Sequence, residues 1–203
     1  HAPTPVMEGV SPGIAAPLDC AKLKADFNIE TGSHKENKEG PTKKNSPTYQ
    51  SHHILQDAAT NGIVSRDAAL AVMLGDSCRD TEHQRVTSRQ NERRDNKKYA
   101  RGGATPGSTF GEVKKQSKAD LSTALAGKRK NAEGREMTQA EAEFLADCLV
   151  AEAEKEAKRQ AKKDGKKLND DTPVERPGGC FVAGTLVWLD AHHKVPVEAL
   201  LRG

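Results

Sequence analysis

The feature that most constrains the fold of this chain is a pair of short strand-like segments followed by a polar helix. Residues 49–55 and 69–74 have the composition of strands, and the Asn61-Gly62 pair between them is a turn signal. Thr81-x-x-Gln84 then has the form of a capping box, and polar helix formers continue through about Asn96. We therefore expect the order strand, loop, strand, helix.

Two more helices are predicted after a glycine-rich break near Gly102. Residues 110 to about 125 carry sparse apolar positions, and a second capping box, Thr138-x-x-Glu141, opens a stronger helix. The tail of that helix, residues 152–163, is almost wholly alanine and charge, so we expect it to be solvated and to fray toward Gly165. The predicted fold class is α+β.

The composition allows only a small core. Hydrophobic residues make up 34% of the chain, aromatic residues 3% and charged residues 30%, so the average position can bury little apolar surface. The four cysteines are widely separated and none has Cys-x-x-Cys spacing. The sequence therefore predicts neither a disulfide scaffold nor a zinc-thiolate site, and it contains no apolar run long enough to cross a membrane.

The basic residues are unevenly distributed. The net charge is only +3, but one polar stretch carries a local excess of positive charge that suits a polyanion such as nucleic acid. A charge run is also commonly a solvated face, and this alternative stays open. The candidate nucleic-acid contacts are Arg85, Arg89, Arg93, Arg94, Lys97 and Lys98.

Adjacent histidines at positions 52 and 53 are the main candidates for chemistry. On a strand they point to opposite faces or diverge at a bulge, so one can bind a metal while the other activates water. On the predicted helix, His83, Thr87 and Asn91 follow at i, i+4 and i+8, with Gln90 close by. Phosphodiester hydrolysis needs a general base and a cation. From spacing alone, an equally good interpretation is that the strand histidines lie on the surface and His83 only orients a helix.

The block Ser51-His52-His53-Ile54-Leu55-Gln56-Asp57-Ala58-Ala59 resembles the SHH signature of HNH/endonuclease VII polymorphic toxins. The downstream Glu82-His83, Thr87 and Gln90 are also similar, and the resemblance covers about residues 46–160. It implies a ββα-metal nuclease fold in which His53 is the general base and His52 and His83 are metal ligands. Secondary candidates for the site are Gln56, Asp57, Thr87, Gln90 and Asn91.

The resemblance also implies a cofactor, partners and a location. We expect a divalent cation, with Mg²⁺ first and Mn²⁺ or Zn²⁺ as alternatives, and a nucleic-acid substrate, DNA before RNA. We also expect a cognate immunity protein and an upstream delivery module. The protein would be a bacterial secreted effector that acts in the cytoplasm of the target cell.

A change of composition at Cys180 predicts a second folding unit. Cys180-Phe181-Val182-Ala183-Gly184-Thr185 resembles the opening of a Hint autoprocessing domain, in which the cysteine attacks the preceding carbonyl, so the scissile bond would be Gly179-Cys180. The expected organisation is a linker (1–45), a nuclease domain (46–163), a second linker (164–179) and a Hint fragment (180–203). Two alternatives remain: a basic module that binds nucleic acid without cutting it, and a processing or linker segment whose only chemistry is at Cys180.

Overall fold

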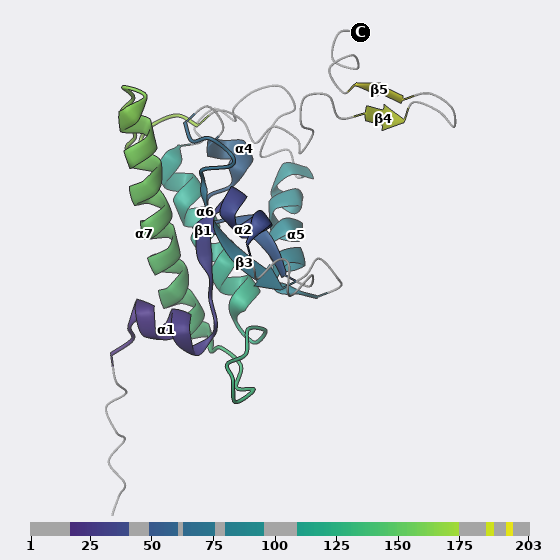
Figure 1. Cartoon of the computed structure of the whole chain (residues 1–203), viewed down its shortest axis with the longest axis vertical. Helices are drawn as coiled ribbons and strands as arrows, with labels where there is room; N and C mark the ends of the chain where they lie inside the picture. The colour runs from purple at the N-terminus through teal and green to yellow at the C-terminus, as the bar shows by residue number, and fades with distance from the viewer. Residues whose placement is uncertain are drawn as a thin grey trace, which may run out of the picture.

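The computed structural model describes residues 17–40, 49–60, 63–75, 80–95 and 109–174, together with two short strands nearer the C-terminus. Figure 1 shows the arrangement of the elements. In chain order they are α1 (Cys20–Asp26), β1 (Thr31–Ser33), α2 (His34–Glu39), β2 (Tyr49–His53), α4 (Asp57–Thr60), β3 (Leu70–Gly75), α5 (Glu82–Asp95), α6 (Phe110–Leu125), α7 (Gln139–Lys163), β4 (Leu186–Trp188) and β5 (Lys194–Pro196). The expected α+β class is confirmed.

Three strands form a small antiparallel sheet in the order β1-β3-β2. The β2–β3 pairing runs without a bulge from Tyr49 opposite Gly75 to His53 opposite Ala71. Both predicted strands are therefore confirmed, although β2 ends two residues before the predicted end. The third strand, β1, pairs with the other edge of β3 and was not predicted.

The two faces of the sheet are covered by different helices, because successive side chains of a strand point to opposite sides. Val72 and Leu74 of β3 belong to the main apolar core, which is completed by side chains of α5, α6 and α7. The opposite face carries Ala71, whose carbonyl oxygen accepts a hydrogen bond from the Asn37 amide of α2 (3.1 Å). Helix α2 thus covers one face and the long helices the other (Figure 1).

The predicted capping boxes differ in how far they form. Thr138 and Glu141 make both reciprocal hydrogen bonds at the start of α7, as sequence spacing predicts. At α5 the backbone N–H of Gln84 donates to Thr81 Oγ1 (3.4 Å), but the Gln84 side chain accepts from the backbone N–H of Asp80 (2.5 Å). At α5 the Gln84 side chain thus bonds Asp80, the residue before the predicted N-cap.

The tail of α7 is buried along one side. Ala153, Ala157 and Ala161 are 4%, 2% and 1% exposed, so the prediction of a wholly solvated tail is wrong for this face. Alanine is small enough to let α7 lie close to its neighbours while the charged residues between face solvent. Gly165 ends the helix in a left-handed conformation (φ +70°), which glycine adopts at little cost.

The folded unit extends beyond residues 46–163 in both directions. On the N-terminal side, Leu23, Phe27 and Ile29 lie in the core, so residues 17–40 are part of the fold rather than a linker. On the C-terminal side, the backbone N–H of Phe110 donates to the Thr172 carbonyl (2.9 Å). Leu168 is buried there as well, so residues 164–174 also pack on the domain.

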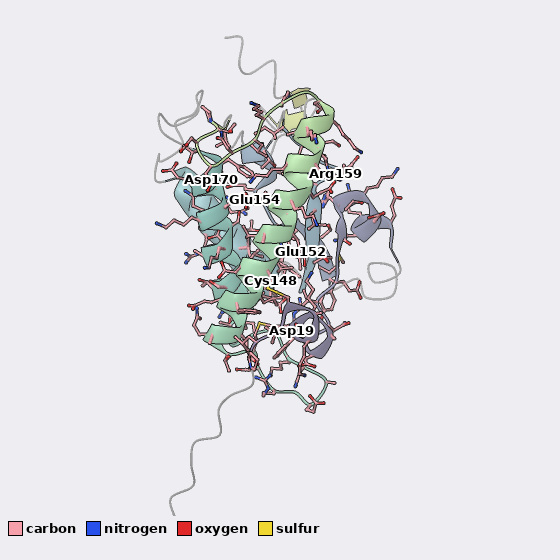
Figure 2. All side chains as sticks on the ribbon, turned by 90° about the vertical axis from the view of Figure 1, so that its left-hand side faces the viewer. Asp19, Cys148, Glu152, Glu154, Arg159 and Asp170 are labelled. Atoms are coloured by element: carbon pink, nitrogen blue, oxygen red, sulfur yellow. A yellow bond between two sulfur atoms is a disulfide. The ribbon has the colours of Figure 1, made fainter. Side chains whose placement is uncertain are left out.

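A disulfide joins Cys20 of α1 to Cys148 of α7, 128 residues apart in the sequence. Figure 2 shows Cys148 on α7 above Asp19, the residue that caps α1. Close by, the Lys24 ammonium contacts both carboxylate oxygens of Glu152. Cysteine spacing gave no sign of this cross-link, because the pairing depends on how α1 docks on α7.

The C-terminal strands β4 and β5 form an antiparallel pair, and β4 lies within the apolar run predicted after Cys180. Cys180 itself lies outside the described residues. Among the residues that the structure describes, no helix combines the length and apolarity that a membrane crossing requires.

Candidate active site

His52 lies on the face of the sheet that the long helices cover, and α5 approaches it there. Its ring meets the ring of His83 edge to face, with the ring centroids 5.1 Å apart. Seven residues further along α5, on the same side of the helix, the side-chain amide of Gln90 lies 3.4 Å from His52 Nε2. The structure thus brings together three of the predicted site residues, one from β2 and two from α5.

His53 points to the other face of the sheet, because β2 is a regular strand at this position. Its Nε2 lies 2.9 Å from the carbonyl oxygen of Arg66. A carbonyl can only accept, so His53 Nε2 carries the proton and donates it. In the neutral ring, Nδ1 is then the basic nitrogen of His53.

His34 is a residue of this second face that sequence reasoning missed. It is 7% exposed, and its Nδ1 is hydrogen-bonded to Ser51 Oγ at 2.8 Å. Its ring also packs on the ring of His53, with the centroids 4.0 Å apart and the planes tilted by 30°. No local signal marked it, because it lies in a polar segment interpreted as linker.

Burial and mutual repulsion keep two of these imidazoles neutral. The pKa of His52 is lowered to about 3, first by burial and then by the positive charges that His83 and His53 would carry. The pKa of His34 is lowered to about 4, again chiefly by burial and next by His53. Both rings are therefore neutral at physiological pH, which is the form that accepts a proton or binds a metal.

Cationic side chains lie near the His34–His53 pair. Lys38 and Arg66 both contribute to lowering the pKa of His34. Lys38 is 3.5 Å from Asp67, and Arg66 is 3.6 Å from Asp57. All four of these side chains are at least one-third exposed, and such exposed pairs are weak, so the two cations can exchange partners for a phosphate. Asp57, one of the predicted site candidates, thus forms an ion pair with Arg66.

The basic residues predicted on α5 have intramolecular partners where the structure describes them. Arg85 pairs with Asp80 (2.8 Å), and Arg89 pairs with the buried carboxylate of Asp120 (2.9 Å). Arg89 therefore neutralises a charge inside the domain. The side chains of Arg93, Arg94 and Asn91 and all of Lys97 and Lys98 lie outside the described part of the chain.

Glu82, beside His83 in the signature, has a structural role. Its carboxylate forms a two-pronged pair with the guanidinium of Arg129, both distances being 2.6 Å, and it accepts from the backbone N–H of Gly75 (2.8 Å). These contacts attach the start of α5 to the end of β3.

The predicted secondary candidates Thr87 and Gln56 are half-buried.

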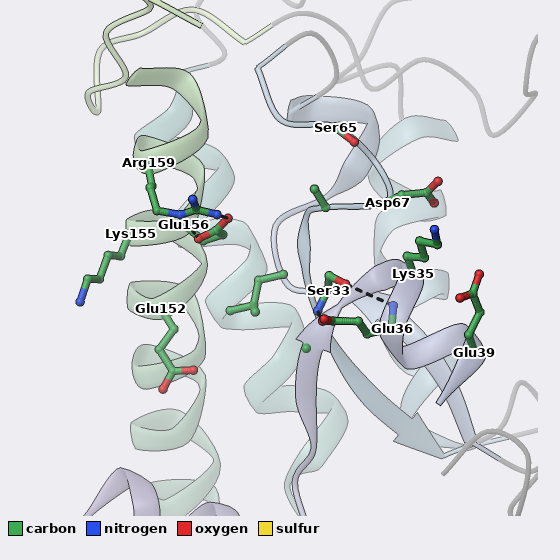
Figure 3. A pocket seen from close by; sticks show the side chains of 13 residues that line it. Ser33, Lys35, Glu36, Glu39, Ser65, Asp67, Glu152, Lys155, Glu156 and Arg159 are labelled. Atoms are coloured by element: carbon green, nitrogen blue, oxygen red, sulfur yellow. Dashed lines mark hydrogen bonds and ion pairs between the residues drawn. The ribbon is translucent and has the colours of Figure 1, made fainter. Parts of the chain in front are cut away.

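A groove of about 940 Å³ lies between α2 and α7, and Figure 3 shows it from close by. Its walls carry mostly charged side chains, including Lys35, Glu36 and Asp67 on one side and Glu152 and Arg159 on the other. None of the predicted site residues lines it. The groove and the histidines are therefore separate features.

The donor set at His52 is rich in nitrogen. The two imidazoles suit ions that accept nitrogen ligands, such as Zn²⁺, better than Mg²⁺, which prefers carboxylate and other oxygen ligands. Across the described residues, no three histidine, cysteine or acidic side chains come together as a complete set of metal ligands.

No protein-family model, curated protein or solved structure matches the chain. The likeness to SHH-type toxins therefore depends on the motif residues themselves.

Proposed function

We propose that the chain is a metal-dependent nuclease whose centre lies at the open edge of β2. The observation that carries the proposal is the meeting of His52 on the strand with His83 and Gln90 on the helix. The order β2, β3, α5 supports the finer hypothesis of a ββα-metal core, since that core is a hairpin followed by a helix with the metal ligands between them.

His53 is the general base of this proposal. With its Nε2–H donated to the Arg66 carbonyl, its Nδ1 takes the proton from the attacking water. Arg66 and Lys38 bind the phosphate oxygens on this face. A divalent cation held by His52 and His83 would supply Lewis-acid stabilisation of the charge that develops on the phosphate and the leaving oxygen.

His52 and His53 point to opposite faces of the sheet. One phosphodiester can reach both only at an edge of the sheet, so the position of β2 matters. In the described sheet β2 has a neighbouring strand on one side only. Among the strands that the structure describes, a phosphate on the other side of β2 meets none that would separate the two faces. An extended nucleic-acid backbone lying along this edge fits that geometry.

The test is cleavage of supercoiled plasmid and of RNA by the full chain with Mg²⁺, Mn²⁺, Zn²⁺ or chelator. We expect cleavage that stops with chelator and falls about 10²- to 10⁴-fold in His53→Ala without loss of metal binding. His83→Ala should instead weaken metal affinity, so that added metal restores activity. Glu143→Gln, an exposed change on α7, is the control.

If chelator leaves cleavage unchanged, the metal assignment is wrong. If neither nucleic acid is cut under any condition, the nuclease proposal is wrong and the non-catalytic binding module becomes the better hypothesis, which a gel-shift assay of the same chain would test.

The biological setting belongs to the same proposal. An immunity protein that covers the site, secretion as a bacterial effector, action in the target-cell cytoplasm and Hint cleavage before Cys180 all depend on the motif resemblance. The Cys20–Cys148 disulfide supports export, because such bonds persist mainly in oxidising compartments. If that cleavage takes place, Cys180→Ala should abolish it at Gly179-Cys180.

A further inference from the structure

Three side chains on the α2 face of the sheet form one connected group. Ser51 and His53 are two residues apart on β2, so both point to this face. His34 of α2 contacts both of them: its Nδ1 is hydrogen-bonded to Ser51 Oγ at 2.8 Å, and its ring lies 4.0 Å from the ring of His53. His34 therefore bridges the first and last residues of the Ser-His-His block.

His34 is itself held rigidly. Its backbone N–H donates to the carbonyl of Ala69 (2.9 Å), and the next N–H, of Lys35, donates to the carbonyl of Asp67 (3.0 Å). Ser33 caps the helix that His34 begins, through a complete capping box with Glu36. These bonds tie the start of α2 to the segment just before β3.

The ring of His53 is constrained from two sides as a result. Its Nε2 is held by the Arg66 carbonyl at 2.9 Å, and one ring face rests against the buried ring of His34. Since the Arg66 carbonyl occupies Nε2, the remaining freedom of the ring is a tilt about this hydrogen bond. The contact with His34 opposes that tilt and so determines where Nδ1 points.

We propose that His34 and Ser51 are positioning residues that hold the His53 ring in its reactive orientation. This inference depends on the proposed nuclease function. It assigns a role to the serine of the signature, which orients His34 through its hydroxyl and does not itself touch the substrate. A base misplaced by about 1 Å can lose on the order of 10²-fold in rate.

The decisive measurement is single-turnover cleavage at saturating metal, with the rate constant and the substrate affinity determined separately. His34→Ala should lower the rate constant about 10- to 100-fold and leave substrate affinity within about 2-fold. His34→Phe, which keeps a ring against His53, should recover part of the loss. Ser51→Ala should slow the wild type but have no further effect in the His34→Phe background, because the hydrogen bond is already absent.

A matched control separates positioning from loss of stability. Leu23→Ala removes a buried side chain of α1 and should lower the urea midpoint of unfolding without changing the rate constant of the folded protein. If His34→Ala slows cleavage no more than Leu23→Ala does, or if Ser51→Ala is fully additive with His34→Phe, the inference is wrong.

A second readout does not depend on activity. Nitrogen-15 NMR at pH 8 should show His53 of the wild type as a single tautomer protonated at Nε2, and His34→Ala should give a mixture of tautomers or ring conformations. If the wild-type protein cuts no nucleic acid but the His53 signals change in this way, the nuclease proposal fails while the positioning contact stands. Unchanged His53 signals would overturn the inference itself.

Discussion

The guanidinium of Arg129 joins three other segments of the chain to its own. It pairs with Glu82 at the start of α5, donates to the Met73 carbonyl of β3 (2.9 Å) and donates to the Asn28 carbonyl after α1 (3.1 Å). The side chains of Arg129 and Glu82 are only 3% and 8% exposed. A charge buried this deeply is tolerated because its hydrogen-bonding groups are satisfied.

Removing one member of this pair should be strongly destabilising. Arg129→Met leaves the Glu82 carboxylate buried without its counter-charge, and we expect a loss of about 3 to 5 kcal/mol in the free energy of unfolding, measured by urea denaturation. The double variant Arg129→Met/Glu82→Leu should lose less than the sum of the single variants. As a control, Lys118→Met breaks an exposed pair with Asp147 and should cost less than about 1 kcal/mol.

At the scale of the element, the start of α7 combines a capping box with an ion pair. Glu141 accepts from the backbone N–H of Thr138 (2.9 Å) and from both terminal nitrogens of Arg135 (2.9 Å each). The hydrogen bonds from Arg135 are the main reason that the pKa of Glu141 is lowered to about 2 from its usual 4.5. The carboxylate is thus favoured in the folded protein.

This shift predicts a pH dependence of stability. Because the pKa is depressed on folding, the stabilisation is complete above about pH 4.5 and is lost as the pH falls toward 2. Glu141→Gln keeps an amide that can still cap the helix but loses the charge, so it should cost about 1 to 2 kcal/mol at pH 7. The difference from wild type in urea denaturation should shrink toward zero near pH 2. A difference that is the same at pH 7 and pH 2.5 would contradict the assignment, and Arg135→Met should mimic the effect.

Local sequence signals were sufficient to predict the helices whose first and last residues are marked in the sequence. Helix α6 occupies the predicted residues, and α7 begins at its capping box and ends near its glycine. Short-range hydrogen bonds and apolar spacing act within a few residues, so they can be recognised without knowing the fold. Strand β1 has only 3 residues and is stabilised by its neighbour, which is why no local pattern predicted it.

At the scale of the whole molecule, the disulfide closes most of the chain into a loop. Cys20 and Cys148 are 128 residues apart, and closing a loop of this size restricts the unfolded chain considerably. Reduction should therefore lower the free energy of unfolding by about 2 to 5 kcal/mol. The measurement is the urea midpoint with and without dithiothreitol.

The double variant Cys20→Ser/Cys148→Ser should have the stability of the reduced protein and show no response to dithiothreitol. An identical midpoint for the oxidised and reduced wild type would show that the cross-link contributes nothing to stability. The core residues Leu23 and Phe27 on α1 should keep the helix docked in the reduced protein, so a loss of stability rather than unfolding is expected.

The sequence by itself determined the α+β class, strands β2 and β3 and the three long helices. All of these follow from spacing along the chain, through the period of a strand or a helix. It also placed His83, Thr87 and Asn91 on one helical face, with Gln90 close by. It left open whether His52 and His53 point to opposite faces or diverge at a bulge, and the regular β2–β3 register decided this.

Only the tertiary structure decided which distant groups meet. The contact of His34 with His53, the pair of Arg129 with Glu82 and the bond between Cys20 and Cys148 join residues from separate parts of the chain. Each depends on how helices and sheet pack, and packing is driven by non-directional burial of apolar surface that leaves no local mark on polar partners. Residues 17–40 join the domain in this way: Leu23, Phe27 and Ile29 pack in the core, and the polar segment after them supplies His34 to the candidate site.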